Sequence, residues 1–299
     1  MNFLIVFLLF IGSLAGVFYV VFAWDAARYS AKRKQPKQEA SLHVNYLYLL
    51  HWARLVNDSR PGAKILDYGC GSGKVVVAGR KLGLDVYGTD IFNESATVYK
   101  EEVEKSGLLG SVIREITNDR LGFDDEYFDV IVNNQVFEHV ENLDLVLAET
   151  YRVMKKGSLL LCLFPSKEII REGHIGIPFA HWFPKNSQLR YYCTLAFRSV
   201  GFGYVKDRKK PKSLWTKEAL DWIDKYTVYR SRADIMRAFS RFFEINLMEH
   251  DYIRYRLSKM KHGKFFLRIL DLPGLPQVSQ VLFRKAAGLV ILARKPLMP

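Results

Sequence analysis

The sequence predicts an α/β protein built on a doubly wound, mostly parallel sheet, and three observations support this fold class. Between residues 61 and 165, short apolar stretches alternate with longer amphipathic ones. The first apolar stretch runs directly into a turn with glycine at alternate positions. The chain has 299 residues, enough to bury a full core of this kind. Strands and helices that alternate at this spacing form a parallel sheet with helices on both faces.

The individual elements follow from periodicity and from the residues that break it. Between residues 61 and 165 the predicted strands are 63–68, 84–88, 111–116, 128–133 and 158–164, and the predicted helices are 74–82, 96–106 and 143–154. A polar linker and a further helix precede them at 36–60. After Pro165 the pattern loosens as far as residue 229; beyond it we predict a helix at 231–243, strand-like residues at 244–256 and a last strand at 288–293.

The charge of the chain is unevenly distributed. The formal net charge is +13. Residues 61–165 hold 11 basic and 17 acidic side chains, whereas residues 166–299 hold 26 basic and 11 acidic ones. A basic half of this size suggests contact with an anionic partner, such as lipid head groups, an acidic or phosphorylated glycan, or nucleic acid.

The N-terminus contains an apolar run of 22 residues without a charge, from Phe3 to Trp24. As a helix it would extend about 33 Å, enough to cross a bilayer. A cleaved signal peptide is the alternative, but no Lys or Arg precedes the run, and the run is longer than a signal-peptide core. Basic residues follow it, among them Arg28, Lys32 and Arg33. The positive-inside rule then predicts a single-pass membrane protein with the rest of the chain in the cytoplasm.

The three cysteines give no sign of a disulfide framework or a zinc site. Cys70, Cys162 and Cys193 are odd in number and lack the C-x-x-C spacing. Cys70 and Cys162 lie in apolar stretches, which is typical of small buried side chains. We therefore predict a reducing compartment and no metal site.

The strongest motif is the run Asp67-Tyr68-Gly69-Cys70-Gly71-Ser72-Gly73-Lys74. It predicts a strand that ends near an acidic residue, a tight turn and a helix. Glycine lets the backbone turn sharply and lets a ligand approach without meeting a Cβ atom. Dinucleotide binding is a competing interpretation, but its G-x-G-x-x-G pattern would need glycine where Lys74 stands.

With this turn the chain resembles the class I, Rossmann-like S-adenosylmethionine-dependent methyltransferases. Three further segments carry the resemblance. They are Leu121-Gly122-Phe123 with the following Phe128-Asp129, then Val136-Phe137-Glu138-His139-Val140, and finally Tyr151-Arg152-Val153-Met154-Lys155-Lys156-Gly157. The four segments occur in the family's order within residues 61–165, and together they are specific.

The resemblance implies S-adenosyl-L-methionine as the cofactor and a set of residues that bind it. Gly69, Gly71 and Gly73 would pass beneath its amino-acid end, with Asp67 near the ammonium group. Asp90 would hold the ribose, since it ends a strand about twenty residues after the turn. The remaining members are Cys70, Ile91, the pair Asn118 and Asp119 for the adenine, with the register uncertain by one residue, and the pair Asn134 and Gln135 near the sulfonium.

On this basis we divide the chain into five segments. They are a transmembrane anchor (1–24), a juxtamembrane basic linker and helix (25–60), a cofactor-binding core (61–165), a substrate cap inserted after the fifth strand with a helix (166–243), and the last strands of the core with a basic insertion (244–299).

Four residues are candidates for catalysis. A hydroxyl acceptor benefits from a general base, usually His or a carboxylate. Glu138 and His139 follow the fourth predicted strand, although packing is an alternative role for His139. His174 and His181 lie in a stretch rich in Gly, Pro and aromatic residues, which suits either a substrate loop or a packed loop. The stretch is also similar to His-x-x-x-Pro-Phe-x-x-Trp-x-Pro segments of bacterial methyltransferases linked to surface-polysaccharide synthesis.

The sequence leaves several acceptors open. The leading hypothesis is O-methylation of a glycan or an anionic glycolipid at the cytoplasmic membrane face, with membrane lipid contacted through the N-terminal helix. The alternatives are a lipophilic small molecule such as a quinone or phospholipid, and a membrane-anchored scaffold that binds the cofactor without turnover. The apolar N-terminus and the absence of an Asn-Pro-Pro-Tyr element at 133–136 argue against nucleic acid as the substrate.

Overall fold

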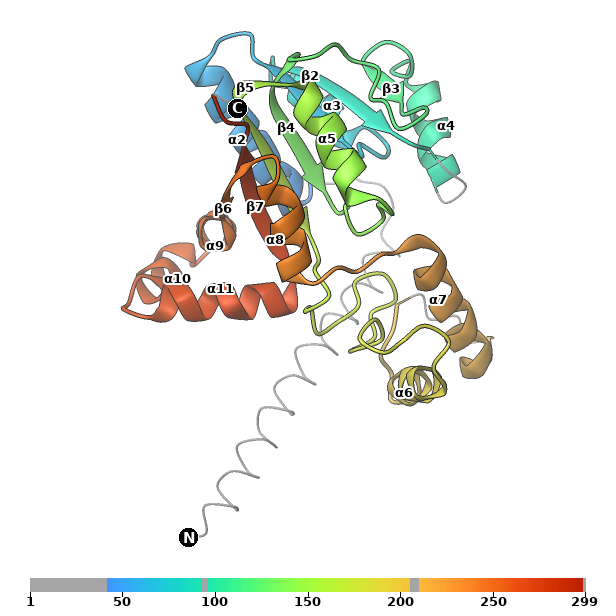
Figure 1. The fold of residues 1–299 in the computed structure, drawn as a ribbon. Helices are drawn as coiled ribbons and strands as arrows, with labels where there is room; N and C mark the ends of the chain where they lie inside the picture. The colour runs from blue at the N-terminus through green and yellow to red at the C-terminus, as the bar shows by residue number, and fades with distance from the viewer. Residues whose placement is uncertain (1–41, 93–95, 205–209, 298–299) are drawn as a thin grey trace. The chain divides into compact units, whose positions relative to one another are not determined.

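The computed structural model describes residues 42–92, 96–204 and 210–297 (Figure 1). The described chain forms two compact units. We call residues 41–169 with 228–299 the core unit, and residues 170–227 the inserted unit.

The core unit contains a seven-stranded sheet in the order β3-β2-β1-β4-β5-β7-β6. Its strands are β1 (Lys64–Tyr68), β2 (Asp85–Asp90), β3 (Ile113–Glu115), β4 (Phe128–Asn134), β5 (Met154–Phe164), β6 (Glu244–Leu247) and β7 (Leu289–Arg294). The pairs from β3 through β5 are parallel, and β7 is antiparallel to both neighbours. The prediction of a mostly parallel sheet is therefore confirmed, and the strand order is consistent with the class I methyltransferase fold.

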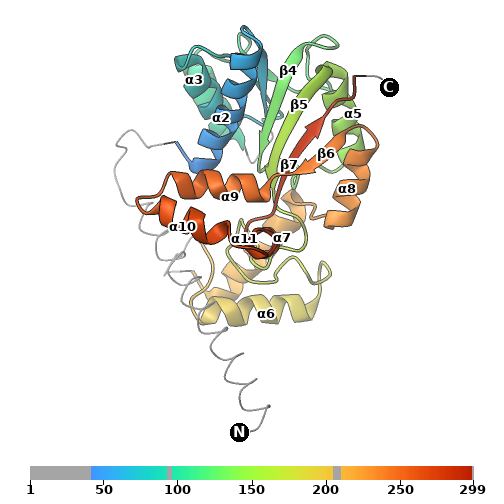
Figure 2. The same cartoon turned by 90° about the vertical axis from the view of Figure 1, so that its left-hand side faces the viewer.

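Helices cover both faces because successive strand residues point to opposite sides. On β5, Leu160, Cys162 and Phe164 belong to one apolar cluster, while Leu161 and Leu163 belong to the other. The first cluster includes buried residues of α5 (Leu143–Val153) and α8 (Arg232–Ser240). The second includes residues of α2 (Val44–Ser59), α3 (Lys74–Lys81), α4 (Thr97–Lys105) and α9 (Glu249–Ser258). The helices stand on the two sides of the sheet in Figure 2.

The inserted unit has its own small core between two helices. These are α6 (Gln188–Ser199) and α7 (Lys212–Tyr226). Ile177, Phe202, Trp215 and Ile223 are buried between the helices and the preceding loop. In addition, the buried Arg190 Nη1 donates to both oxygens of Asp224, at 2.7 and 2.8 Å. Periodicity alone left most of this region unassigned.

The C-terminal segment differs most from the sequence prediction. The prediction of strand-like residues over 244–256 is wrong beyond Leu247, because β6 ends there and α9 begins at Glu249. In α9 the buried residues Glu249 and Tyr252 lie three positions apart, which is a helical spacing rather than an alternating one. Two further helices follow, α10 (Gly263–Leu270) and α11 (Leu275–Ala286), before the chain returns to the sheet as β7.

The predicted membrane anchor at 1–24 lies outside the described residues. Among the residues that the structure does describe, no helix has the length and the apolar character needed to cross a membrane.

One buried ion pair ties the loop before β4 to α5. Glu149 Oε1 accepts hydrogen bonds from the Leu121 backbone N–H at 2.9 Å and from Arg152 Nη2 at 2.7 Å. Arg152 also donates to the Phe123 carbonyl at 2.9 Å and to Asp125. Burial acts to raise the pKa of Glu149, but the hydrogen bonds from Arg152 and Leu121 outweigh it and hold that pKa below its usual value. The ion pair of Glu149 and Arg152 thus joins the motif at 121–129 to the motif at 151–157.

We expect Arg152→Met to lower the free energy of unfolding by about 2 kcal/mol, because Glu149 loses its charge-assisted hydrogen bonds from Arg152 and keeps Arg120 as its cation, whose Nη1 lies 3.5 Å from Glu149 Oε2. Urea denaturation at pH 7 measures this, with Arg54→Met at an exposed ion pair as the control. Since the folded-state pKa of Glu149 is lowered, its contribution is present above the unfolded value near 4.5 and is lost as the pH falls further. A wild-type midpoint for Arg152→Met would contradict the role given to this pair.

Candidate functional site

The glycine turn and the end of β2 are held together by one carboxylate. Asp90 Oδ2 accepts a hydrogen bond from the Gly71 backbone N–H at 2.7 Å, and Asp90 Oδ1 accepts one from the Ile91 N–H at 2.8 Å. The backbone N–H groups of Gly69 and Cys70 donate to the Thr89 carbonyl at 2.8 and 3.0 Å. The loops after β1 and β2 therefore form one rigid edge.

The glycines of this turn are required for different reasons. Gly69 and Gly71 have positive φ angles of 76° and 51°, which favour glycine. A Cβ atom on Gly69 would lie 2.2 Å from Val136 Cγ2, so that position is closed by the protein itself. A Cβ atom on Gly71 would meet only the Tyr99 ring, at 3.7 Å. At Gly71 a Cβ atom would therefore make an ordinary van der Waals contact, and the positive φ angle is what favours glycine there. At Gly73 a Cβ would again meet protein, 2.7 Å from Ile113 Cδ1.

Asp67 is a buried acid at the end of β1. Its side chain is buried, and burial followed by the charge of Asp90 raises its pKa to about 8. Tyr46 of α2 lies near it, since burial and then the charges of Asp67 and Tyr99 raise the pKa of the Tyr46 phenol. A buried carboxyl of this kind gains stability from a cation. The sequence motif indicated Asp67, but no signal in the sequence indicated Tyr46.

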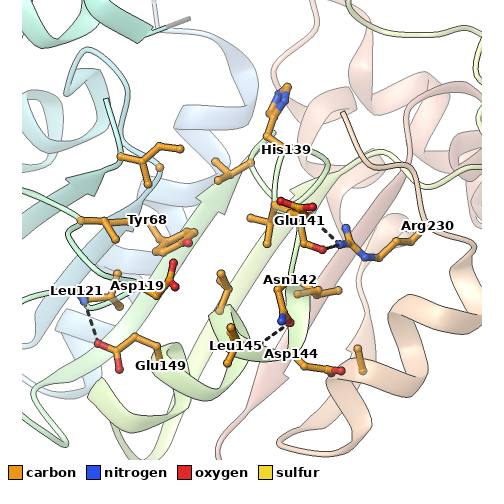
Figure 3. Close-up of a pocket in the computed structure, with 18 of the residues that line it drawn as sticks. Tyr68, Asp119, Leu121, His139, Glu141, Asn142, Asp144, Leu145, Glu149 and Arg230 are labelled. Carbon is orange, nitrogen blue, oxygen red and sulfur yellow. Dashed lines mark hydrogen bonds between the residues drawn. The ribbon is translucent and has the colours of Figure 1, made fainter. Parts of the chain in front are cut away.

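A cavity of about 910 Å³ opens beside the carboxyl ends of the first four strands (Figure 3). Tyr68, Gly69, Asp90, Ile91 and Asp119 line it on one side. The segment from Val136 to Val146 and residues of α8 line the other. Burial, followed by the charges of Asp90, Asp119 and Glu149, raises the pKa of Tyr68, so its phenol stays protonated and can donate a hydrogen bond. The sheet side of the cavity is acidic.

The structure places Asn118 and Asp119 differently with respect to the cavity. Both residues have positive φ angles, 50° and 58°, within a tight turn closed by the Arg120 N–H and the Thr117 carbonyl at 3.0 Å. Asp119 lines the cavity and points toward Tyr68 in Figure 3, while Asn118 is not among the lining residues.

Asn134 and Gln135, which the resemblance placed near the sulfonium, form hydrogen bonds with other residues of the protein. Asn134 Oδ1 accepts a hydrogen bond from Asn45 Nδ2 of α2 at 2.8 Å. Asn45 in turn accepts one from the Tyr252 hydroxyl of α9. Gln135 is exposed, and its backbone N–H donates to the Leu163 carbonyl at 2.7 Å. Neither residue lines the large cavity.

Glu138 and His139 are neighbours with different surroundings. Glu138 is buried, whereas His139 is exposed and lines the cavity. The nearest nitrogen and oxygen atoms of the two side chains, His139 Nε2 and Glu138 Oε1, are 4.0 Å apart. Arg230, which the sequence analysis did not single out, fixes this loop, because its guanidinium donates to the carbonyls of Val140 at 2.7 Å and Glu141 at 2.6 Å.

The other two catalytic candidates belong to the inserted unit. His174 Nδ1 lies 2.7 Å from Glu172 Oε1. Glu172 is fully buried, and its second oxygen accepts from the backbone N–H groups of His174 and Ile175. The carboxylate therefore fixes both the orientation and the tautomer of the imidazole, an arrangement suited to a general base. His181 is buried beside Trp182.

Cys70 belongs to the packing of the turn. Its Sγ lies 3.0 Å from where a Cβ on Gly88 of β2 would stand. Burial raises the pKa of the thiols of both Cys70 and Cys162, so neither is a thiolate at neutral pH.

The family described as "Methyltransferase domain" matches residues 66–162. A ubiquinone biosynthesis O-methyltransferase from Roseobacter denitrificans is 36% identical over 101 residues, which cover 34% of this chain and 40% of that protein. A ubiquinone/menaquinone biosynthesis C-methyltransferase from Vibrio campbellii is 33% identical over 126 residues, covering 40% of this chain and 49% of that protein. The chain thus spans about half or less of the length of these relatives.

Among solved structures, an S-adenosylmethionine-dependent methyltransferase from Mesorhizobium loti aligns with a TM-score of 0.47 and 16% identity, covering 82% of this chain and 96% of that one. The family match and the relatives agree with the four sequence motifs. Residues 66–162 therefore match a methyltransferase domain.

Proposed function

We propose that the protein is an S-adenosylmethionine-dependent methyltransferase whose acceptor is the hydroxyl group of a lipophilic, quinone-type molecule at a membrane face. The observation that carries the proposal is the acidic cavity at the carboxyl ends of the strands, which residues of the matched methyltransferase domain line together with Arg230 and residues of α8. The quinone-type acceptor draws support from the ubiquinone methyltransferases among the relatives. This reverses the order of the acceptors favoured by sequence alone. The membrane location draws support from the apolar run at 3–24.

The residues around the turn fit the chemistry of this cofactor. S-adenosylmethionine carries a sulfonium and an ammonium group, and when bound it supplies an electrophilic methyl group. Asp67 is buried and Asp90 is half-buried nearby. Because two neighbouring carboxylates repel each other, a bound cation would stabilise their ionised forms. We assign Asp67 to the ammonium, Asp90 to the ribose and Asp119 to the adenine. A carboxylate has about four acceptor positions, so Asp90 can bind ribose hydroxyls while it holds Gly71 and Ile91.

His174 is our candidate for the general base. Its Nδ1 faces the Glu172 carboxylate at 2.7 Å, so Nε2 is the nitrogen that exchanges a proton with an acceptor. In an O-methylation, His174 Nε2 takes the hydroxyl proton, and Glu172 stabilises the imidazolium that forms.

A glycan acceptor is the second candidate, and one observation favours it. The inserted unit exposes three large aromatic side chains, Trp182 at 41%, Tyr192 at 62% and Trp222 at 37%. Flat aromatic rings with a polar edge are suited to stacking against sugars.

Incubation of the full chain with methyl-labelled cofactor and bacterial membrane lipids tests the acceptor. We expect label in the quinone fraction, and label confined to glycolipid would replace the main proposal with the second candidate. His174→Ala should lose most of the turnover and keep its affinity for the cofactor, whereas the exposed control His262→Ala should keep both. Unchanged turnover in His174→Ala would remove this residue as the base.

Asp90→Ala should raise the dissociation constant for S-adenosylmethionine about 10- to 100-fold, because charge-assisted hydrogen bonds to the ribose are lost. Isothermal titration calorimetry measures this directly. Asp85→Asn, on the same strand at its far end, is the matched control and should bind as the wild type does. Wild-type affinity for the Asp90 variant would exclude Asp90 from the site.

Cofactor binding should release a proton near pH 7. With its pKa at about 8, Asp67 is mostly protonated in the free protein, and it must ionise to face an ammonium group. Affinity should therefore fall as the pH is lowered from 8 to 6. Calorimetry at pH 7 in buffers of different ionisation enthalpy counts the proton. Asp67→Asn should bind more weakly and release none; proton release that persists in this variant would assign it to another group.

A further inference from the structure

The helices α10 and α11 carry apolar side chains that the core unit does not cover. On α10 and just beyond it, Phe265, Phe266, Ile269 and Leu272 are 63%, 43%, 40% and 53% exposed. On α11, Val278, Val281 and Leu282 are 51%, 53% and 61% exposed, and no residue of that helix is buried. The two helices contact each other and α9. Figure 1 shows them beyond α9, at the end of the unit away from α3 and α4.

Most of the exposed apolar residues lie on faces distinct from those that pack, while Phe266 lies one turn before the buried Leu270. Phe265, Ile269 and Leu272 follow the spacing i, i+4 and i+7, while the buried Leu270 points elsewhere on the same helix. On α11, Val278, Val281 and Leu282 share one face, and Phe283 contacts Tyr252 of α9, with ring centroids 5.4 Å apart. Each helix therefore packs against the rest of the core unit with one face and exposes apolar side chains on another.

The chemistry of the flanking residues indicates what covers these faces. Lys259, Lys261, Lys264 and Arg268 are exposed around α10. Lys264 and Arg268 are one turn apart and directly precede Phe265 and Ile269 in the sequence, so they border the apolar face. From residue 259 to 285 there are six basic side chains and one acidic side chain, Asp271, which pairs with Arg254. An apolar face bordered by cations is the pattern of helices that lie in the surface of an anionic bilayer.

We propose that the α10–α11 pair is a second membrane-binding element that lies in the surface of an anionic lipid bilayer. The exposed Phe, Ile, Leu and Val side chains enter the boundary between head groups and acyl chains, and Lys261, Lys264 and Arg268 contact the lipid phosphates. The element is separate from the apolar run at 3–24, and the inference is independent of the proposed reaction.

A depth measurement at one site on the full chain distinguishes this element from any insertion of the N-terminus. A spin label on Leu282→Cys reports the α11 face, in a Cys193→Ser background because Cys70 and Cys162 are buried. A label on Lys81→Cys, an exposed site on α3, is the control. With vesicles of phosphatidylcholine mixed with phosphatidylglycerol, residue 282 should lose collisions with a water-soluble nickel chelate and gain collisions with oxygen. Residue 81 should change in neither.

The basic border is tested in the same labelled chain. Lys264→Gln with Arg268→Gln should raise the lipid concentration needed to half-convert the spectrum at residue 282 about 30-fold. The matched pair Lys81→Gln with Lys105→Gln should leave it unchanged, and both pairs are exposed, so circular dichroism and thermal midpoints should match the parent chain.

Two results would overturn the proposal. In the first, residue 282 stays as accessible to the nickel chelate as residue 81 in the presence of anionic vesicles. In the second, residue 282 is already shielded without vesicles, which would mean that another part of this chain or a second copy covers the face.

Discussion

Parallel pairing of β1 with β2 and β4 is the constraint on which the rest of the core unit depends. Asp67 pairs in register with Gly88 and Val132, so the ends of three strands meet at one edge. The loops that leave this edge then lie side by side, and Asp90 can accept from Gly71 although nineteen positions separate them. Without this register the glycine turn would be an ordinary loop. With it, buried acids, a rigid turn and a cavity share one place.

Electrostatics divides the molecule by function. The segment at 61–165 is acidic in sum, and Asp67, Asp90 and Asp119 lie near the carboxyl ends of the first three strands. Burial, followed by the charge of Asp90, raises the pKa of Asp67. Such a site favours a cationic ligand, as the proposed cofactor is. The basic excess lies after residue 165, and part of it borders the apolar faces of α10 and α11. The acidic residues thus face the proposed cationic cofactor, and the basic residues face the proposed anionic bilayer.

The supporting contacts show why the methyltransferase motifs occur together. The Arg152 guanidinium donates directly to Phe123 and Asp125. It also donates to Glu149, which in turn accepts from the Leu121 N–H. Two of the recognised segments are therefore joined by one set of hydrogen bonds. Arg230 similarly fixes the loop that carries His139, through the carbonyls of Val140 and Glu141. Glu149, Arg152 and Arg230 therefore influence the cavity by fixing the loops that line it.

The sequence by itself predicted strands at 63–68, 84–88 and 128–133, the glycine turn and the parallel sheet, because alternation and glycine act locally. The structure has these strands at Lys64–Tyr68, Asp85–Asp90 and Phe128–Asn134. Only the tertiary structure shows that Asp119 lines the cavity and that Asn118 is not among the lining residues, which depends on how a tight turn faces Tyr68. The tertiary structure also brings Tyr46 near Asp67 and places the Arg230 guanidinium against the Val140 carbonyl. It also turned residues 249–258 into a helix. Local patterns encode the backbone, whereas contacts between distant side chains depend on packing that no short stretch of sequence contains.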